Sequence, residues 1–200
     1  MNRHDSKVLI SGVVVFLLVA VTAVIFGSNA EESAEMAQDL FDDIFQGMTP
    51  ISEEGSSSGE LTQGGTETVT IVSEDRAIMN ISAVLTWSDE PDQRRIRVYQ
   101  NQPDTFSISI TDPNGNVTDT GSASNSRGGE GRVELQVSLT QEEAASLVGT
   151  GNWTIDVTLD SVGDYEARLG VGLWPITPTD SGNDFSLTYE IEYYDLSEEE

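Results

Sequence analysis

The sequence predicts a mainly β protein, an antiparallel β-sandwich preceded by a transmembrane helix and a short amphipathic helix. Three patterns predict it: an uncharged apolar run near the N-terminus, helical spacing of apolar residues after it, and period-two alternation over residues 66–195. Connections of the jelly-roll or immunoglobulin-like Greek-key type are both compatible with this many strands. The chain has 200 residues and no cysteine, so the fold cannot depend on disulfides.

The apolar run covers residues 8–26 and contains no charged residue. As a helix it is long enough to cross a hydrocarbon core of about 30 Å. The leader, residues 1–7, carries Arg3 and Lys7, whereas acidic residues begin at Glu31. Because positive charge stays in the cytoplasm, we expect a single pass through the cytoplasmic or plasma membrane, with the N-terminus inside and the rest outside.

A cleaved signal peptide is the alternative to a retained anchor. Ser28 and Ala30 are small residues at the positions that precede a cut after Ala30. The apolar run is longer than the usual signal core, which favours an anchor in which Val8 to Phe26 contacts membrane lipid. Both interpretations export the remainder of the chain.

Residues 28–48 predict an acidic amphipathic helix. Its apolar stripe recurs at spacings of three and four and consists of Ala34, Ala37, Leu40, Phe41, Ile44, Phe45 and Met48. Its other face is acidic, and such a helix does not bind anionic lipid, so the stripe must contact protein. We therefore predict that Phe41, Ile44 and Phe45 bind a partner. A homo-oligomeric stalk, a neighbouring membrane helix and the chain's own domain are the three alternatives.

Residues 49–65 read as a Gly/Ser linker, because little apolar surface interrupts the glycines and serines there. A flexible chain of this length would span about 20–25 Å. We therefore expect a tether between the membrane segment and the domain.

The domain, residues 66–195, alternates apolar and polar residues in successive strands, and an acidic tail, residues 196–200, follows it. The strands are expected around residues 67–72, 81–87, 96–100, 106–110, 116–120, 133–139, 153–159, 165–173 and 185–193. One short helix is expected after Thr140, which forms a capping box with Glu143 and ends at Gly149.

Three segments resemble the order of elements in the jelly-roll P-domains that accompany subtilisin-like proteases. They are the strand and Pro-Gly turn of residues 106–115, the G-x-W strand of residues 149–157, and the aromatic strand of residues 182–188. The same segments are similar to many archaeal surface β-sandwiches. The resemblance covers about 80 residues of turns and core, without a catalytic motif, and implies architecture alone.

The residue inventory argues against enzymatic chemistry and nucleic-acid binding. The one histidine, His4, and the one lysine, Lys7, precede the apolar run, so no Ser-His, Ser-Lys or Schiff-base mechanism is available beyond it. Carboxylate pairs remain, but 35 acidic residues bring some together by chance. A net charge of −26 repels a phosphate backbone. We expect no enzyme and no cofactor other than Ca²⁺.

Calcium is the small-ligand hypothesis. Asp112, Asn114, Asn116 and Asp119 offer oxygen atoms at nearly alternate positions, which suits a hard cation, and the acidic loop of residues 180–184 offers more. The same residue types are those that an ordinary hairpin turn requires, and this is the competing interpretation.

Three further features concern the exported surface. Asn80, Asn116 and Asn152 stand in N-glycosylation sequons, a number that a Ser/Thr-rich chain also produces by chance. Trp174 falls out of phase with the core positions and is predicted to be exposed and to bind a partner or glycan, with packing within its own loop as the alternative. Arg94, Arg95 and Arg97 form a basic cluster in the acidic domain, where local salt bridges or an acidic partner would explain them.

The charge suggests a habitat and, with the topology, a role. Such an excess of carboxylates, balanced by arginine rather than lysine, is the pattern expected of a protein kept hydrated in high salt, as in a halophilic archaeon. We expect a non-enzymatic, membrane-anchored extracytoplasmic domain that acts as a binding or assembly subunit of a cell-envelope complex. A calcium- or glycan-binding surface module and a homo-oligomeric stalked surface protein are the alternatives.

Overall fold

The computed structural model describes residues 45, 48–89, 93–94, 98–163, 166–167 and 180–196. The predicted membrane segment, residues 8–26, and most of the predicted amphipathic helix lie outside these residues. In the part of the chain that is described, no helix is both long and apolar enough to cross a membrane.

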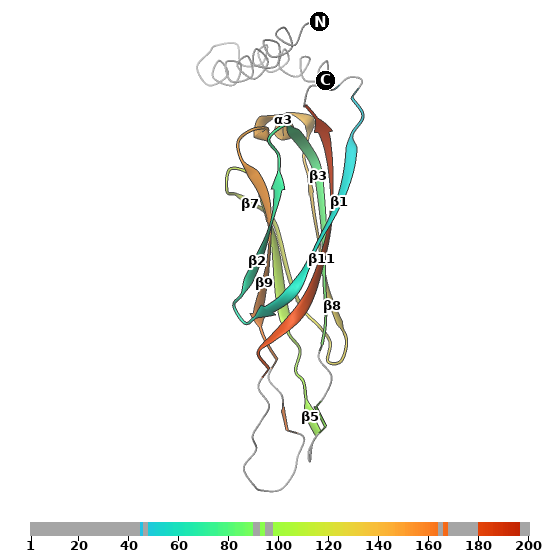
Figure 1. Cartoon of the computed structure of the whole chain (residues 1–200), viewed down its shortest axis with the longest axis vertical. Coiled ribbons are helices and arrows are strands. Elements are labelled where there is room, and N and C mark those ends of the chain that lie inside the picture. Colours follow the sequence, from blue (N-terminus) through green and yellow to red (C-terminus); the bar gives the residue numbers. More distant parts are fainter. Residues whose placement is uncertain are drawn as a thin grey trace, which may run out of the picture.

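Two four-stranded antiparallel sheets form the body of the molecule (Figure 1). Sheet A has the order β1-β11-β3-β8 and consists of β1 (Ile51–Thr62), β11 (Gly182–Asp195), β3 (Arg76–Ser88) and β8 (Glu130–Ser138). Sheet B has the order β2-β9-β6-β7 and consists of β2 (Thr66–Val72), β9 (Asn152–Ser161), β6 (Thr105–Thr111) and β7 (Val117–Ser124). The predicted antiparallel β-sandwich is confirmed.

Strand order selects between the two predicted connection patterns. Each sheet places an early strand beside a late one, β1 next to β11 in one sheet and β2 next to β9 in the other. Successive strands β6 and β7 pair within sheet B, and the chain then crosses to sheet A at β8. This is the jelly-roll arrangement of two interleaved antiparallel sheets.

The core lies between the sheets and follows the predicted alternation. One side chain in two along β3, β6 and β9 is almost fully buried, and the largest of these are Ile81, Leu85, Phe106, Ile108, Trp153 and Leu159. Trp87 contacts Phe106 with ring centroids 5.0 Å apart, which extends the aromatic packing to one end of the core. Period two thus buries one face of each strand, as expected from the pleat.

The predicted linker over residues 49–65 is wrong for Ile51–Thr62, which forms β1, and the sandwich therefore begins before residue 66. β1 pairs with β11 along twelve positions, and its two glycines lie opposite aromatic residues, Gly55 opposite Tyr189 and Gly59 opposite Phe185. The aromatic rings cover the space that glycine leaves empty, so a strand poor in apolar residues is stabilised by side chains of its neighbour.

A turn at Gly64 carries the chain from β1 in sheet A to β2 in sheet B. Gly64 has a φ of 77° and its N–H donates to the Leu159 carbonyl at 2.8 Å, while Leu159 N donates to the Gly65 carbonyl at 3.2 Å. The glycines predicted to make this segment flexible instead supply a positive φ in a hydrogen-bonded turn.

The short helix α3 (Gln141–Leu147) closes one end of the sandwich. Thr140 caps it as predicted: its hydroxyl accepts from Glu143 N at 3.3 Å, while Thr140 N donates to the Glu143 carboxylate at 2.9 Å. Ala144 is buried against Ala77 and Phe45 in a second, smaller apolar cluster. This cluster fills the space between α3 and the adjoining ends of β3 and β11.

A small three-stranded sheet lies at the opposite end of the molecule (Figure 1). It has the order β10-β5-β4, made of β10 (Glu166–Ala167), β5 (Val98–Gln100) and β4 (Gln93–Arg94). β5 falls within the strand predicted for residues 96–100. Of the strand predicted for residues 165–173, only Glu166–Ala167 is described as a strand.

Candidate binding surfaces

The outer face of sheet B is a grid of hydroxyl groups. Across β2, β9, β6 and β7, the register aligns Thr66 with Thr158, Ser107 and Ser122, and the next row aligns Thr68 with Asp156, Ser109 and Thr120. A third row aligns Thr70, Thr154 and Thr111. Ten hydroxyl residues thus surround Asp156 within this grid, and Ser107 Oγ donates to a second carboxylate, Asp160 Oδ1, at 3.0 Å.

Cross-strand hydrogen bonds link part of the grid. The hydroxyls of Thr66 and Thr158 lie 2.8 Å apart, and Thr68 Oγ1 donates to Asp156 Oδ1 at 2.5 Å. Hydroxyl pairs of this kind stabilise neighbouring strands and keep the face ordered. The result is a hydroxyl-rich surface with fewer carboxylates than sheet A, on a protein of net charge −26.

The outer face of sheet A is acidic by comparison. It carries one basic residue, Arg132, and seven carboxylates, those of Glu54, Glu60, Glu130, Glu134, Asp184, Glu190 and Glu192. The register places Glu54 directly opposite Glu190 and Glu60 directly opposite Asp184. Like charges opposite one another oppose strand pairing, and salt reduces that repulsion.

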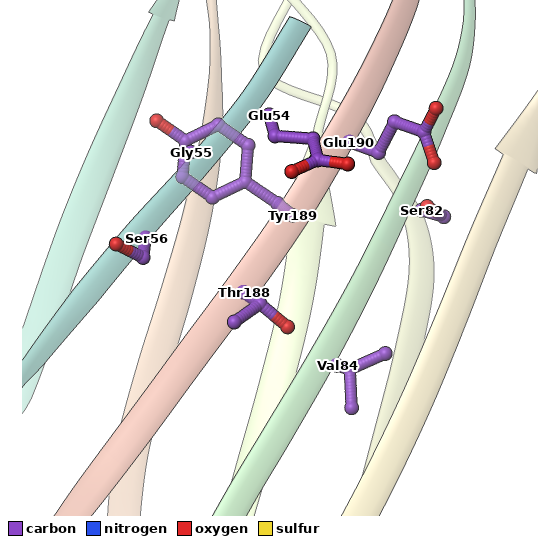
Figure 2. A pocket seen from close by; sticks show the side chains of 8 residues that line it. All are labelled: Glu54, Gly55, Ser56, Ser82, Val84, Thr188, Tyr189 and Glu190. Carbon is purple, nitrogen blue, oxygen red and sulfur yellow. The ribbon is translucent and has the colours of Figure 1, made fainter.

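An open groove of about 580 Å³ crosses this acidic face (Figure 2). Its lining includes small residues of three neighbouring strands, Ser56, Ser82 and Thr188, with Glu54 and Glu190 at one end. Figure 2 shows the Tyr189 ring reaching from β11 across β1 at Gly55. The groove combines hydroxyls and carboxylates, but none of the lining residues is a histidine, lysine or cysteine.

A buried polar cluster joins the strand ends beside the three-stranded sheet. Asp104, completely buried, accepts a hydrogen bond from Gly163 N at 2.7 Å and another from Asn183 Nδ2 at 2.6 Å. Asn183 Nδ2 also donates to the Ser88 carbonyl at 3.0 Å, and Asp104 N donates to Asn125 Oδ1 at 2.6 Å. The cluster ties together the points where the chain leaves and re-enters the sandwich.

Burial raises the pKa of the Asp104 carboxyl above its ordinary value, and the nearby carboxylates of Asp180 and Asp89 act in the same direction. The hydrogen bonds from Gly163 and Asn183 oppose this shift. Among the residues described, no group of three or more acidic, histidine or cysteine side chains has the geometry to hold a metal ion. The hydrogen bonds of Asp104 join Gly163, Asn183 and Asn125 and thereby stabilise this end of the sandwich.

The proposed calcium ligands divide into a turn and a strand. Asp112 Oδ1 accepts from Asn114 N at 2.9 Å and from Asn116 N at 2.8 Å, while Asp112 Oδ2 accepts from Asn116 Nδ2 at 2.9 Å. Partial burial acts against them, but these bonds hold the pKa of Asp112 below its ordinary value. The turn thus satisfies its carboxylate without a cation, as in an ordinary Asx-turn, and calcium binding stays a prediction.

Asp119, the fourth proposed ligand, bridges the two sheets. Its carboxylate accepts from Gln136 N of β8 at 3.1 Å and from Thr120 N at 2.8 Å. Beside it, Gly121 allows β7 and β8 to approach, because a Cβ there would lie 2.7 Å from Val133 Cγ1. Asp119 and Gly121 therefore close the edge of the sandwich formed by β7 and β8.

The three sequons differ in their surroundings. Asn116 and Asn152 are exposed, whereas Asn80 is half-buried and its Oδ1 accepts from Ser138 Oγ at 3.1 Å. Asn116 belongs to the Asp112 turn, and Asn152 begins β9 at the margin of the hydroxyl grid, opposite Val72. Use of any of the three stays a prediction.

The predicted partner-binding residues are only partly described. Phe45 is 5% exposed and packs on Tyr194, with ring centroids 4.9 Å apart, so its assignment to a partner surface is corrected. Its apolar ring is satisfied by the chain's own domain. Phe41, Ile44 and Trp174 lie outside the described residues, as do Arg95 and Arg97, and their roles stay predictions.

The hydroxyl grid was not among the predicted sites, although its signal is present in the sequence. Threonine and serine recur at every second position in residues 66–70 and 105–111, and Thr154 and Thr158 flank Asp156 at the same spacing. Each segment alone reads as the polar face of a strand. Only the sheet order brings the segments side by side, which is why a pattern within one strand could not reveal a continuous surface.

Comparisons with known proteins leave the family undefined. No family model and no curated protein sequence matches the chain. A structure described as Bacillus endospore appendages that form disulfide-linked pili is similar over 74% of this chain and 92% of that chain, with 9% identity and a TM-score of 0.34. A Yersinia pseudotuberculosis-derived mitogen (75% and 92%, 10% identity, TM-score 0.34) and Desmodium yellow mottle tymovirus (77% and 93%, 9% identity, TM-score 0.33) are similar to the same degree. Similarities this weak carry no argument about partner or function.

Proposed function

We propose that this protein is a non-enzymatic, membrane-anchored extracytoplasmic β-sandwich that serves as a binding or assembly subunit of a cell-envelope complex. The observation that carries the proposal is the hydroxyl grid of sheet B. A partner that approaches the acidic face of sheet A must meet seven carboxylates, whereas the grid presents Asp156 and, at its margin, Asp160. Approach of an acidic envelope component therefore costs least over sheet B.

Given the proposed anchor, the two ends of the sandwich indicate how the domain would stand on the membrane. Phe45, which follows the predicted membrane segment in the chain, packs at the α3 end. The three-stranded sheet lies at the other end (Figure 1). In a retained anchor with an external domain, the α3 end would face the membrane and both sheet faces would stand clear of it.

Matched arginine substitutions on the two faces test the proposal. Thr158→Arg places a bulky cation in the hydroxyl grid, and Thr86→Arg places the same group on sheet A. Tagged full-length chains would be purified from native membranes in mild detergent, and each co-purifying component would be quantified by mass spectrometry. We expect at least a tenfold loss with Thr158→Arg and little change with Thr86→Arg. Equal recovery with both variants would contradict an assembly role for the grid.

A further inference from the structure

The free edge of β1 is a long unpaired strand edge. β1 lies at the margin of sheet A and pairs on one side only, with β11, and no other described strand is hydrogen-bonded to it. Because the backbone groups of successive residues point alternately to the two sides of a strand, about half of the twelve residues of β1 present N–H and C=O groups at the free edge that another strand can bind. The opposite margin of the sandwich is closed by the contact of Asp119 with Gln136 N, so the two margins are not equivalent.

The centre of β1 is nearly symmetric about Ser57. Residues 55–59 read Gly-Ser-Ser-Ser-Gly, with Glu54 before them and Glu60 after them. A second copy that runs antiparallel, with Ser57 opposite its own counterpart, would place Gly55 opposite the second Gly59 and Ser56 opposite the second Ser58. Each central pair would consist of small residues, so the two backbones could approach without a clash.

Aromatic rings on β11 supply apolar surface at the same place. A Cβ on Gly55 would lie 2.1 Å from Tyr189 Cζ and 2.3 Å from Tyr189 Oη, so the half-buried Tyr189 ring occupies the space above this glycine (Figure 2). A Cβ on Gly59 would meet Phe185 Cε1 at 3.6 Å. In the symmetric arrangement the Tyr189 ring of one copy would lie near the Phe185 ring of the other.

We propose that β1 pairs antiparallel with β1 of a second copy around Ser57, which joins the two A sheets into one continuous sheet. A closed two-fold contact of this kind is the commonest form of self-association. The shared edge is small, so the contact is transient unless both chains are concentrated in membranes.

Salt controls this pairing. The proposed register places Glu54 opposite the second Glu60, and each already faces a carboxylate of β11. The other nearby acid, Glu53, is neutralised by Arg76 Nη1 at 2.9 Å and is not part of the repulsive group. The Debye length falls from about 10 Å at 0.1 M salt to about 3 Å at 1 M, so pairing should be weak at the lower concentration and strong at the higher one.

The pairing also sets the direction of the two molecules. β1 starts at the α3 end, so antiparallel β1 strands put the α3 end of one copy beside the far end of the other. Given the proposed membrane anchor, on which this step rests, the paired chains would come from two facing membranes. The kind of partner that fits this edge is therefore a second copy across an intermembrane gap.

Single cysteines test the register, because the chain has none of its own. Opposed residues in antiparallel strands have Cα atoms about 4.5–5.5 Å apart, within the range that a disulfide spans. In full-length chains in detergent at about 1 M salt, S57C alone should form disulfide-linked dimers under mild oxidation. S56C alone and S58C alone should form few, whereas an equimolar mixture of S56C and S58C should form mixed dimers. Melting by circular dichroism would verify that each variant is folded.

Two outcomes overturn the proposal. One is the absence of dimers from S57C and from the mixture at high salt. The other is cross-linking of S122C, on the far strand β7 of sheet B, at the same rate as S57C, which would indicate random collision in shared micelles. E54Q should increase the S57C dimer yield at about 0.1 M salt by roughly tenfold, because it removes both symmetric carboxylate pairs. No increase with E54Q would also contradict the register.

An experiment with lipid vesicles tests the facing-membrane step separately from the β1 pairing. S56C chains and S58C chains would be reconstituted in two separate vesicle populations of neutral lipid and then mixed at about 1 M salt. Mixed dimers between the populations support pairing across facing membranes. Dimers in detergent without dimers between vesicles would overturn the facing-membrane step while leaving the β1 pairing intact.

Discussion

The two edges of the sandwich are built in opposite ways. At one edge, β7 and β8 are held together by the Asp119 carboxylate on Gln136 N, and Gly121 lets the strands approach over Val133. At the other edge, β1 is longer, two of its glycines lie beside rings of β11, and no described strand pairs with its outer side. An edge strand is a template for association unless it is blocked. The difference identifies β1 as the edge through which this molecule can associate.

Gly121 at the closed edge and Gly55 at the open edge also differ in the side chains that lie beside them. Gly121 faces stiff, buried side chains of β8, whereas Gly55 faces the far end of a half-buried tyrosine. Glycine is needed at the closed edge for packing between strands. At the open edge it leaves room that a movable ring fills.

Asp104 belongs to neither edge, and we expect its substitution to cause the largest loss of unfolding free energy. The losses caused by substitutions at the two edges can be compared with it. Asp104→Ala should lower the free energy of unfolding by about 3 kcal/mol, because it leaves the buried donors of Gly163 and Asn183 without their acceptor. Urea unfolding would measure the loss. A loss below that of the edge variants would mean that the cluster contributes less than its burial indicates.

The raised pKa of Asp104 predicts that the effect of Asp104→Ala on the free energy of unfolding depends on pH. Because burial raises the pKa of Asp104 above 3.8, the folded state holds this proton to a higher pH than the unfolded chain does. The stability contributed by the protonated form is present below 3.8 and is lost as the pH rises through the raised value. The difference in unfolding free energy between the wild type and Asp104→Ala should therefore shrink as the pH rises over this window. A constant difference would contradict it.

Matched alanine substitutions at the two edges should differ in cost. Gly121→Ala should lower the free energy of unfolding by about 2 kcal/mol, because its Cβ would lie 2.7 Å from Val133 Cγ1 and 3.1 Å from Leu135 Cδ2. Gly55→Ala should cost less than about 1 kcal/mol, since the Tyr189 ring can turn aside. Thermal melting monitored by circular dichroism would compare them. Equal losses of unfolding free energy in the two variants would contradict the distinction between a packed edge and an open one.

The hydrogen bond between the Asp119 carboxylate and Gln136 N at the closed edge should contribute less to stability than the packing at Gly121. Asp119→Ala should cost about 0.5–1 kcal/mol, because it removes the hydrogen bond from Gln136 N at an exposed margin where water can replace the carboxylate. Asp119→Asn retains an acceptor oxygen and should recover about half of that loss. Faster amide hydrogen exchange at Gln136 in the alanine variant alone would locate the effect, and unchanged exchange would contradict it.

Calcium should produce the smallest effect at the β6–β7 turn of the closed edge. The Asp112 carboxylate already accepts three hydrogen bonds within its turn, so a cation would have to replace them. We expect millimolar Ca²⁺ to change the melting temperature of the wild type and of Asp112→Asn equally. A rise confined to the wild type would instead support the predicted calcium site.

Local pattern was sufficient for most of the sandwich. Alternation identified the cores of β2, β3, β6, β8, β9 and β11, and Thr140 with Glu143 identified α3, because these signals depend on neighbouring residues alone. β1 could not be found in this way. Its glycines and serines carry no strand preference, and its stabilising rings, Phe185 and Tyr189, lie about 130 residues further along the chain.

By itself, the amino-acid sequence determined which residues face inward, where the short helix begins, and how acidic the surface is, since each depends on side-chain chemistry at known spacing. The tertiary structure decided which strands are neighbours. Strand neighbours determine that serines and threonines of four strands form one face, that carboxylates gather on the other, and that one edge is closed while β1 stays open. Register and sheet order arise from contacts distant in sequence, and these no local pattern contains.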